Sequence, residues 1–189
     1  MRLFRSGLRV VLGLYAVCAS QASEFSSVEI RMGSRATGIE SKCAELLKSR
    51  LTEIGGPNVR IARETDPASD QKVIVLWLGM ITSHDAMAAR LNADRIKPLT
   101  DRDPGPEGFL VRSYSESEQP VLLVAGVDQR GVLYAVGEIL RRAIVNPNSV
   151  SFPDSINVRT APAFEVRGTQ FGQSGVAKRV AQVRDWTDE

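Results

Sequence analysis

The chain has 189 residues, with 24 Lys and Arg against 22 Asp and Glu, which gives a formal net charge of +2. It is 43% hydrophobic and 24% charged, which is typical of a soluble globular domain and excludes collagen-like, coiled-coil and fully disordered chains. The length allows one sizeable hydrophobic core. It excludes a complete (β/α)₈ barrel, which needs roughly 250 residues.

The first 22 residues predict a secretory signal peptide. A short apolar run, 10–19, follows a basic segment and precedes several small residues. The basic residues are Arg2, Arg5 and Arg9. The run is well short of the ~20 residues of a membrane-spanning helix. We expect cleavage after Ala22, with Ala19 as the alternative, and an exported protein, periplasmic or extracellular, with no membrane contact after cleavage.

Removal of this segment changes the charge balance. It carries three arginines and no acid, so 24 basic residues become 21 against 22 acidic ones, a net charge of −1. The remaining sequence has no stripe of Lys and Arg interleaved with aromatic residues. We therefore expect no nucleic-acid partner.

The first half of the chain alternates strands and helices. Residues 28–31 and 58–62 alternate apolar with polar positions, and 73–79 is apolar throughout, as expected of a strand covered on both faces. A helix is predicted from about Ile39 to Ile54, ending at Gly55-Gly56-Pro57, and another begins at a Ser83 cap. Cys43 lies on the apolar face of the first helix, where it should pack as a small hydrophobe.

The second half predicts a hairpin and a strong helix. A loop, 93–107, leads into strands 108–114 and 121–125, which are joined by a polar turn. Apolar residues with helical spacing follow Asp128, the predicted N-cap, up to Asn146-Pro147-Asn148. We predict an α+β fold, an α/β sandwich in which amphipathic helices pack on a mixed sheet of about five strands.

Tests for chemistry are mostly negative. His84 is the only histidine and there is no CxxC or HExxH motif, so we expect no metal, no cofactor and no catalytic Ser–His or Cys–His arrangement. The turn 126–131 matches neither the P-loop motif nor the dinucleotide-binding G-x-G-x-x-G motif, so it does not indicate a phosphate-binding site. Three carboxylate pairs lie in polar segments, where nothing would raise a pKa as a general acid needs. They are Asp101/Asp103, Glu116/Glu118 and Asp188/Glu189.

Three segments together resemble a known family. They are Glu107-Gly108-Phe109-Leu110-Val111, the turn and helix 126–136, and Ala161-Pro162-Ala163-Phe164-Glu165-Val166-Arg167-Gly168. In this order and spacing they resemble the non-catalytic N-terminal domain of β-hexosaminidase and α-glucuronidase type glycoside hydrolases, which precedes a (β/α)₈ catalytic barrel. The resemblance spans about residues 25–171, and 107–168 is its specific part.

The resemblance implies a signal peptide at 1–22, an accessory domain at 23–162 and the truncated start of the barrel at 163–189. It assigns no catalytic residue to this chain. In hexosaminidase-like members the arginine of the Phe-x-x-Arg-Gly segment reaches sugar hydroxyls, so Arg167 is the substrate-binding residue it implies. The aspartate often found after Arg-Gly is absent, since Thr169 follows. We expect a fragment that is inert alone. In full-length relatives, the barrel would bind the glycan.

Two other functions stay open. The first is a self-contained secreted module that binds glycans without hydrolysing them, although its aromatic residues do not cluster in sequence. The second is a doubly wound nucleotide-binding domain, which the alternation of elements would also fit. Of the three functions, this one ranks last because the sequence has neither phosphate-binding motif.

Overall fold

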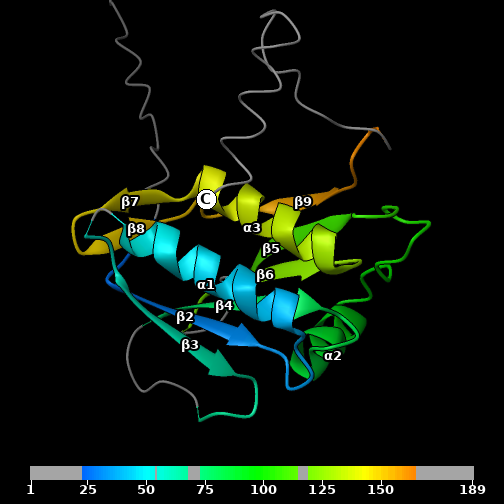
Figure 1. Cartoon of the computed structure of the whole chain (residues 1–189), viewed down its shortest axis with the longest axis horizontal. Coiled ribbons are helices and arrows are strands. Elements are labelled where there is room, and N and C mark those ends of the chain that lie inside the picture. Colours follow the sequence, from blue (N-terminus) through cyan, green and yellow to red (C-terminus); the bar gives the residue numbers. More distant parts are fainter. Residues whose placement is uncertain (1–22, 54, 68–72, 115–118, 165–189) are drawn as a thin grey trace, which may run out of the picture.

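A six-stranded mixed sheet forms the centre of the protein, of which the computed structural model describes residues 23–53, 55–67, 73–114 and 119–164 (Figure 1). In spatial order its strands are β3 (Asn58–Arg63), β2 (Ser27–Met32), β4 (Ile74–Met80), β6 (Val121–Gly126), β5 (Phe109–Tyr114) and β9 (Asn157–Thr160). The first four are mutually parallel, and β5 is antiparallel to both β6 and β9. The predicted α+β class is therefore confirmed.

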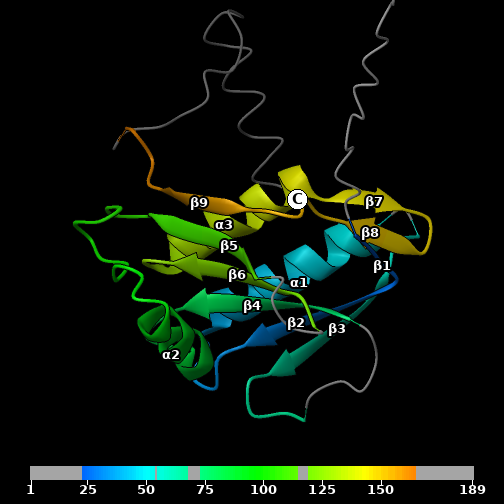
Figure 2. The same ribbon diagram turned by 180° about the vertical axis from the view of Figure 1, so that it is seen from behind.

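Helices cover both faces of the sheet unequally. The helices α1 (Gly38–Thr52) and α3 (Gln129–Arg142) lie side by side on one face, and α2 (Asp85–Ala93) lies on the other (Figures 1 and 2). Alternate strand residues such as Ile30, Leu76 and Val124 face α1 and α3 in the main core. Met87 and Leu91 of α2 pack on Leu110, Leu123 and Ala125 in a smaller second core. The alternation along the strands thus serves two separate hydrophobic layers.

The predicted number of strands was wrong. The sheet has six strands because residues 157–160 form β9, which pairs with the edge of β5. A second sheet, in the order β1-β8-β7, was not predicted. Its strands are β1 (Glu24–Phe25), β7 (Ile144–Asn146) and β8 (Ser149–Ser151).

The predicted end of the helix that follows Asp128 was also wrong. The sequence Asn146-Pro147-Asn148 does not end the helix, which stops at Arg142 with Ala143 in an extended conformation. Instead it forms the turn between β7 and β8, and Asn148 adopts a φ of 62°, a conformation that asparagine tolerates. The predicted hairpin of β5 and β6 is confirmed.

No helix in the described ranges is both long and apolar enough to span a membrane.

Candidate functional site at the carboxyl edge of the sheet

The carboxyl ends of β2 and β4 form a topological switch point. From β2 the chain passes through α1 to β3 on one side, and then returns to β4 on the other side of β2. Open α/β sheets bind ligands in the crevice outside such strand ends. The loops that follow these strands therefore form the candidate site.

The two loops at the switch point touch each other. The amide of Arg35 donates to the carbonyl of Ser83 at 3.3 Å. A Cβ on Gly33 would lie 1.9 Å from the same carbonyl oxygen, so only glycine allows the backbones to approach this closely. The two loops are therefore in direct backbone contact at this edge.

Glu40 is buried beneath these loops and serves as a hydrogen-bond hub. Its carboxylate accepts the amides of Thr37 at 2.7 Å and Met80 at 2.8 Å, and the hydroxyl of Ser83. Burial acts to raise the pKa of Glu40, but the hydrogen bonds from Ser83, Thr37 and Met80 outweigh it and the pKa is lowered. The carboxylate also lies against Gly79, where a Cβ would approach it to 2.7 Å.

Glu64 connects the loop after β3 to the beginning of α2. It accepts the amides of Ser34 at 2.6 Å and Ala86 at 2.9 Å, and its Oε2 lies 2.9 Å from Nδ1 of His84. Burial acts to raise the pKa of Glu64, but the bonds from Ala86 and Ser34, with His84, lower it to about 2. Glu64 is therefore ionised at neutral pH.

His84 is fully buried and takes the N-cap position of α2 that the sequence assigned to Ser83. Its ring packs against Trp77, with centroids 5.7 Å apart. Burial lowers the pKa of His84, although Glu64 acts to raise it, so the imidazole is neutral at neutral pH. Nδ1 of His84 accepts the amide of Met87 at 3.3 Å and lies beside Oε2 of Glu64.

These groups do not form a nucleophilic arrangement. The hydroxyl of Ser83 bonds to Glu40 and to the carbonyl of Met80, while His84 faces Glu64. A catalytic serine must instead share a hydrogen bond with its histidine base. The cluster joins the loops and the helix start.

The third helix begins at the same edge and is capped by Asp128, as predicted. The carboxylate of Asp128 accepts the amides of Gly131 at 2.8 Å and Glu107 at 2.9 Å. All three described helices therefore begin with amides that bond to a carboxylate of this chain: Glu40, Glu64 or Asp128. Free helix N-termini bind phosphates. Here the chain's own carboxylates occupy those positions, which disfavours the nucleotide-binding alternative.

The segments that carry the family resemblance meet beside this third helix. The amide of Val127 donates to the carbonyl of Gly108 at 2.8 Å, and a Cβ on Gly131 would lie 2.2 Å from that oxygen. A Cβ on Gly108 would in turn lie 3.3 Å from the Cβ of Ala161. We call this contact of 104–108, 126–131 and 161–164 the exit junction.

The remaining sequence-predicted residues have varied outcomes. Arg167 lies outside the described residues, as do the pairs Glu116/Glu118 and Asp188/Glu189. Cys43 is a buried free thiol, as predicted, and burial raises its pKa. Asp103 pairs with Lys97 and Arg159, and these two partners lower its pKa. No group of three or more His, Cys, Asp or Glu within the described ranges could hold a metal ion.

Sequence reasoning missed the roles of Glu40 and Glu64. For Glu40 a signal was present, because Thr37-x-x-Glu40 is a capping box and the structure shows both of its hydrogen bonds. For Glu64 no local signal exists. Its partners lie 30 and 22 residues away and meet it only through the register of parallel strands.

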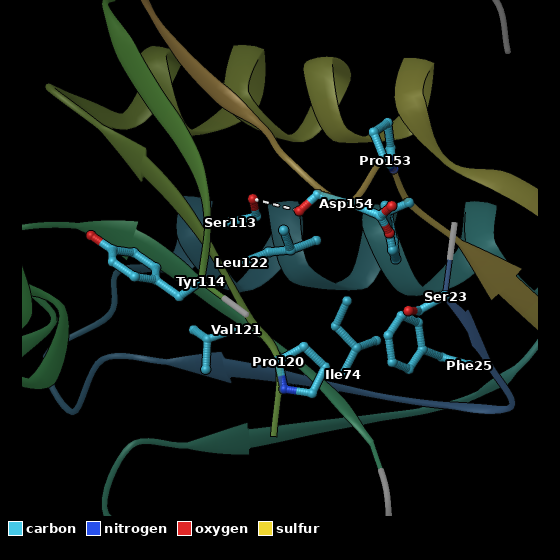
Figure 3. A pocket seen from close by; sticks show the side chains of 11 residues that line it. Ser23, Phe25, Ile74, Ser113, Tyr114, Pro120, Val121, Leu122, Pro153 and Asp154 are labelled. Carbon is cyan, nitrogen blue, oxygen red and sulfur yellow. Dashed lines mark hydrogen bonds between the residues drawn. The ribbon is translucent and has the colours of Figure 1, made fainter. Parts of the chain in front are cut away.

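An apolar pocket of about 280 Å³ lies at the opposite, amino edge of the parallel strands (Figure 3). Its walls come from the starts of β4 and β6, the end of β5, β1, and the segment after β8. The lining residues are Ser23, Phe25, Ile74, Ser113, Tyr114, Pro120, Val121, Leu122, Phe152, Pro153 and Asp154.

Comparisons with known proteins give no match by sequence but a distant likeness in structure. No protein-family model matches the sequence, and no curated protein matches it. Among solved structures, the chain resembles CpGH84D, a glycoside hydrolase family 84 protein, with 9% sequence identity and a TM-score of 0.48. The match covers 72% of this chain and 20% of that protein, so the chain spans only a small part of its length.

Proposed function

We propose that this chain is a non-catalytic accessory domain from the N-terminal side of an exported glycoside hydrolase. The observation that carries the proposal is the exit junction. The sequence resemblance selected three segments by their residues alone, and their described parts pack against one another at one edge of the sheet. Such segments have a joint structural role.

The charge environment supports an accessory role over a catalytic one. Hydrolysis of a glycosidic bond by paired carboxyl groups needs one acid with a raised pKa. Among the described carboxyl groups with a shifted pKa, every shift is downward. These groups are Glu40, Glu64, Asp85, Asp94, Asp103 and Glu138.

The position of the junction supports a domain that adjoins further structure. Strand β9 runs toward the carboxyl edge, where Ala161 contacts the loop before β5. The side chain of Phe164, just beyond, is 73% exposed. An exposed phenylalanine at this position suits a contact with a following barrel, in which Arg167 would reach sugar hydroxyls.

Two measurements test the proposal. The DNA downstream of this reading frame should encode a (β/α)₈ barrel, in frame or shifted. The purified chain should release no fluorophore from 4-methylumbelliferyl β-N-acetylglucosaminide or the matching β-glucuronide. Downstream sequence that encodes no barrel, or hydrolysis at a rate that follows the amount of protein, would refute it. Glycan-array binding that is lost in Arg167→Ala would instead support the glycan-binding module.

A further inference from the structure

The pocket at the amino edge reaches into the main hydrophobic core. Four of its lining side chains, Phe25, Ile74, Leu122 and Phe152, are core residues, and none is more than 7% exposed. These buried side chains form the floor of the pocket, and its other side is open to solvent. Closely packed side chains seldom leave this much space beside a core.

Local hydrogen bonds hold the backbone segments that surround the pocket. The hydroxyl of Ser113 accepts the amide of Ile156 at 2.8 Å and lies 3.4 Å from the carbonyl of Asp154 (Figure 3). These bonds hold the segment after β8 against β5 with a small side chain between them. Pro120 and Pro153 fix the backbone on two further sides. These hydrogen bonds and prolines restrain the backbone around the pocket.

The lining defines the chemistry of a ligand. Among the described residues that line the pocket there is no Lys, Arg or His, and the only ionisable side chains are Tyr114 and Asp154. The hydroxyl of Tyr114 points away from the pocket in Figure 3. Asp154 already interacts with other groups of the chain, and the hydroxyl of Ser113 is engaged as described. The lining thus offers apolar surface and rings, with the exposed Ser23 at the rim.

We propose that this pocket binds a compact, neutral aromatic or branched aliphatic group, with a polar end directed to Ser23. The volume supports this class. An apolar protein cavity of about 150 Å³ accommodates benzene, and drug-sized sites begin at about 300 Å³. A space of about 280 Å³ accommodates a one- or two-ring group. A bound group would supply the van der Waals contacts that these core residues lack on the side that faces the pocket.

The test uses the whole chain and N-phenyl-1-naphthylamine, a neutral dye that fluoresces in apolar surroundings. We expect saturable binding to one site, with displacement by indole and no displacement by methyl β-glucoside. Ser23→Trp should close the rim and weaken dye binding about tenfold or more. The matched control is Ser26→Trp, because Ser26 is also exposed but does not line the pocket.

Each outcome has a defined meaning once thermal melting shows that both variants fold as the parent chain does. Saturable binding that is lost in Ser23→Trp and retained in Ser26→Trp supports the site. Fluorescence that rises without saturation, equal binding by both variants, or displacement by the glucoside overturns it. The result is independent of the proposed glycoside hydrolase role, which makes no use of this pocket.

Discussion

The carboxylate of Glu64 and the imidazole of His84 lie 2.9 Å apart and connect the loop after β3 to the start of α2. Both groups are almost completely shielded from solvent, with side-chain exposures of 8% and 0%. Glu64 also accepts the backbone amides of Ser34 and Ala86. The pair therefore makes the stability of the carboxyl edge dependent on pH.

We predict two steps of acid destabilisation. The pKa of His84 is lowered below 6.5, so as the pH falls below 6.5 the unfolded chain binds a proton that the folded chain does not, and stability declines. The pKa of Glu64 is lowered from 4.5 to about 2, so its stabilising contribution is complete above 4.5 and is lost as the pH falls toward 2. Urea denaturation at pH 7.5, 5.5, 4 and 3 measures both steps.

The variant Glu64→Gln separates the second step from the first. At pH 7 it should lower the free energy of unfolding by on the order of 2 kcal/mol, because a neutral amide replaces the ionised acceptor. It should also flatten the decline between pH 4.5 and 3. Glu53→Gln is the control, since Glu53 is exposed and pairs only at the surface with Arg50. Equal pH profiles for Glu64→Gln and the parent chain would contradict the assignment.

Because carboxylates cap the helix starts, we predict that phosphate and ATP do not change the stability of the protein. Glu40, Glu64 and Asp128 each already accept an amide at a described helix start, so we expect a negatively charged ATP or phosphate to be disfavoured there. The melting temperature should be the same in millimolar ATP, in phosphate and in potassium chloride of equal ionic strength. A saturable rise with ATP alone would restore the nucleotide-binding alternative.

Two glycines on α3 provide a matched test of the exit junction. A Cβ on Gly131 would lie 2.2 Å from the backbone oxygen of Gly108, whereas a Cβ on Gly137 meets nothing within 4 Å. Gly131→Ala should destabilise the fold by about 2–3 kcal/mol, because backbone atoms must move apart. Gly137→Ala should stabilise it by about 0.5–1 kcal/mol through helix propensity. Similar melting temperatures for the two variants would show that the junction is loosely packed.

Local signals in the sequence account for the elements that were predicted correctly. The run 73–79 predicted β4 because burial on both faces leaves no polar position, and the spacing after Asp128 predicted α3. The short strands β1, β7 and β8 escaped because two or three residues carry no periodic pattern. β7 and β8 pair across a short turn, but β1 pairs with β8 across more than 100 residues of chain.

The candidate site was less predictable than the fold. Asp128 could be assigned because a cap acts within three residues. The partners of Glu64 and the contact of Gly33 with Ser83 depend on how parallel strands align, which a single sequence does not encode locally. The burial of His84 against Trp77 likewise arises from the packing of α2 on the sheet.

Asp128 joins two parts of the exit junction, and its substitution measures their connection. Asp128→Ala removes acceptors for the amides of Gly131 and Glu107, and should cost about 2 kcal/mol, more than a simple helix cap. Asp128→Asn keeps one side-chain oxygen and should lose about half as much. Thermal and urea unfolding of both variants give these differences.

Hydrogen exchange should show a faster Glu107 amide in both variants, since an asparagine oxygen that caps Gly131 leaves Glu107 without its acceptor. An unchanged Glu107 exchange rate in Asp128→Ala would show that the loop before β5 is held by other contacts.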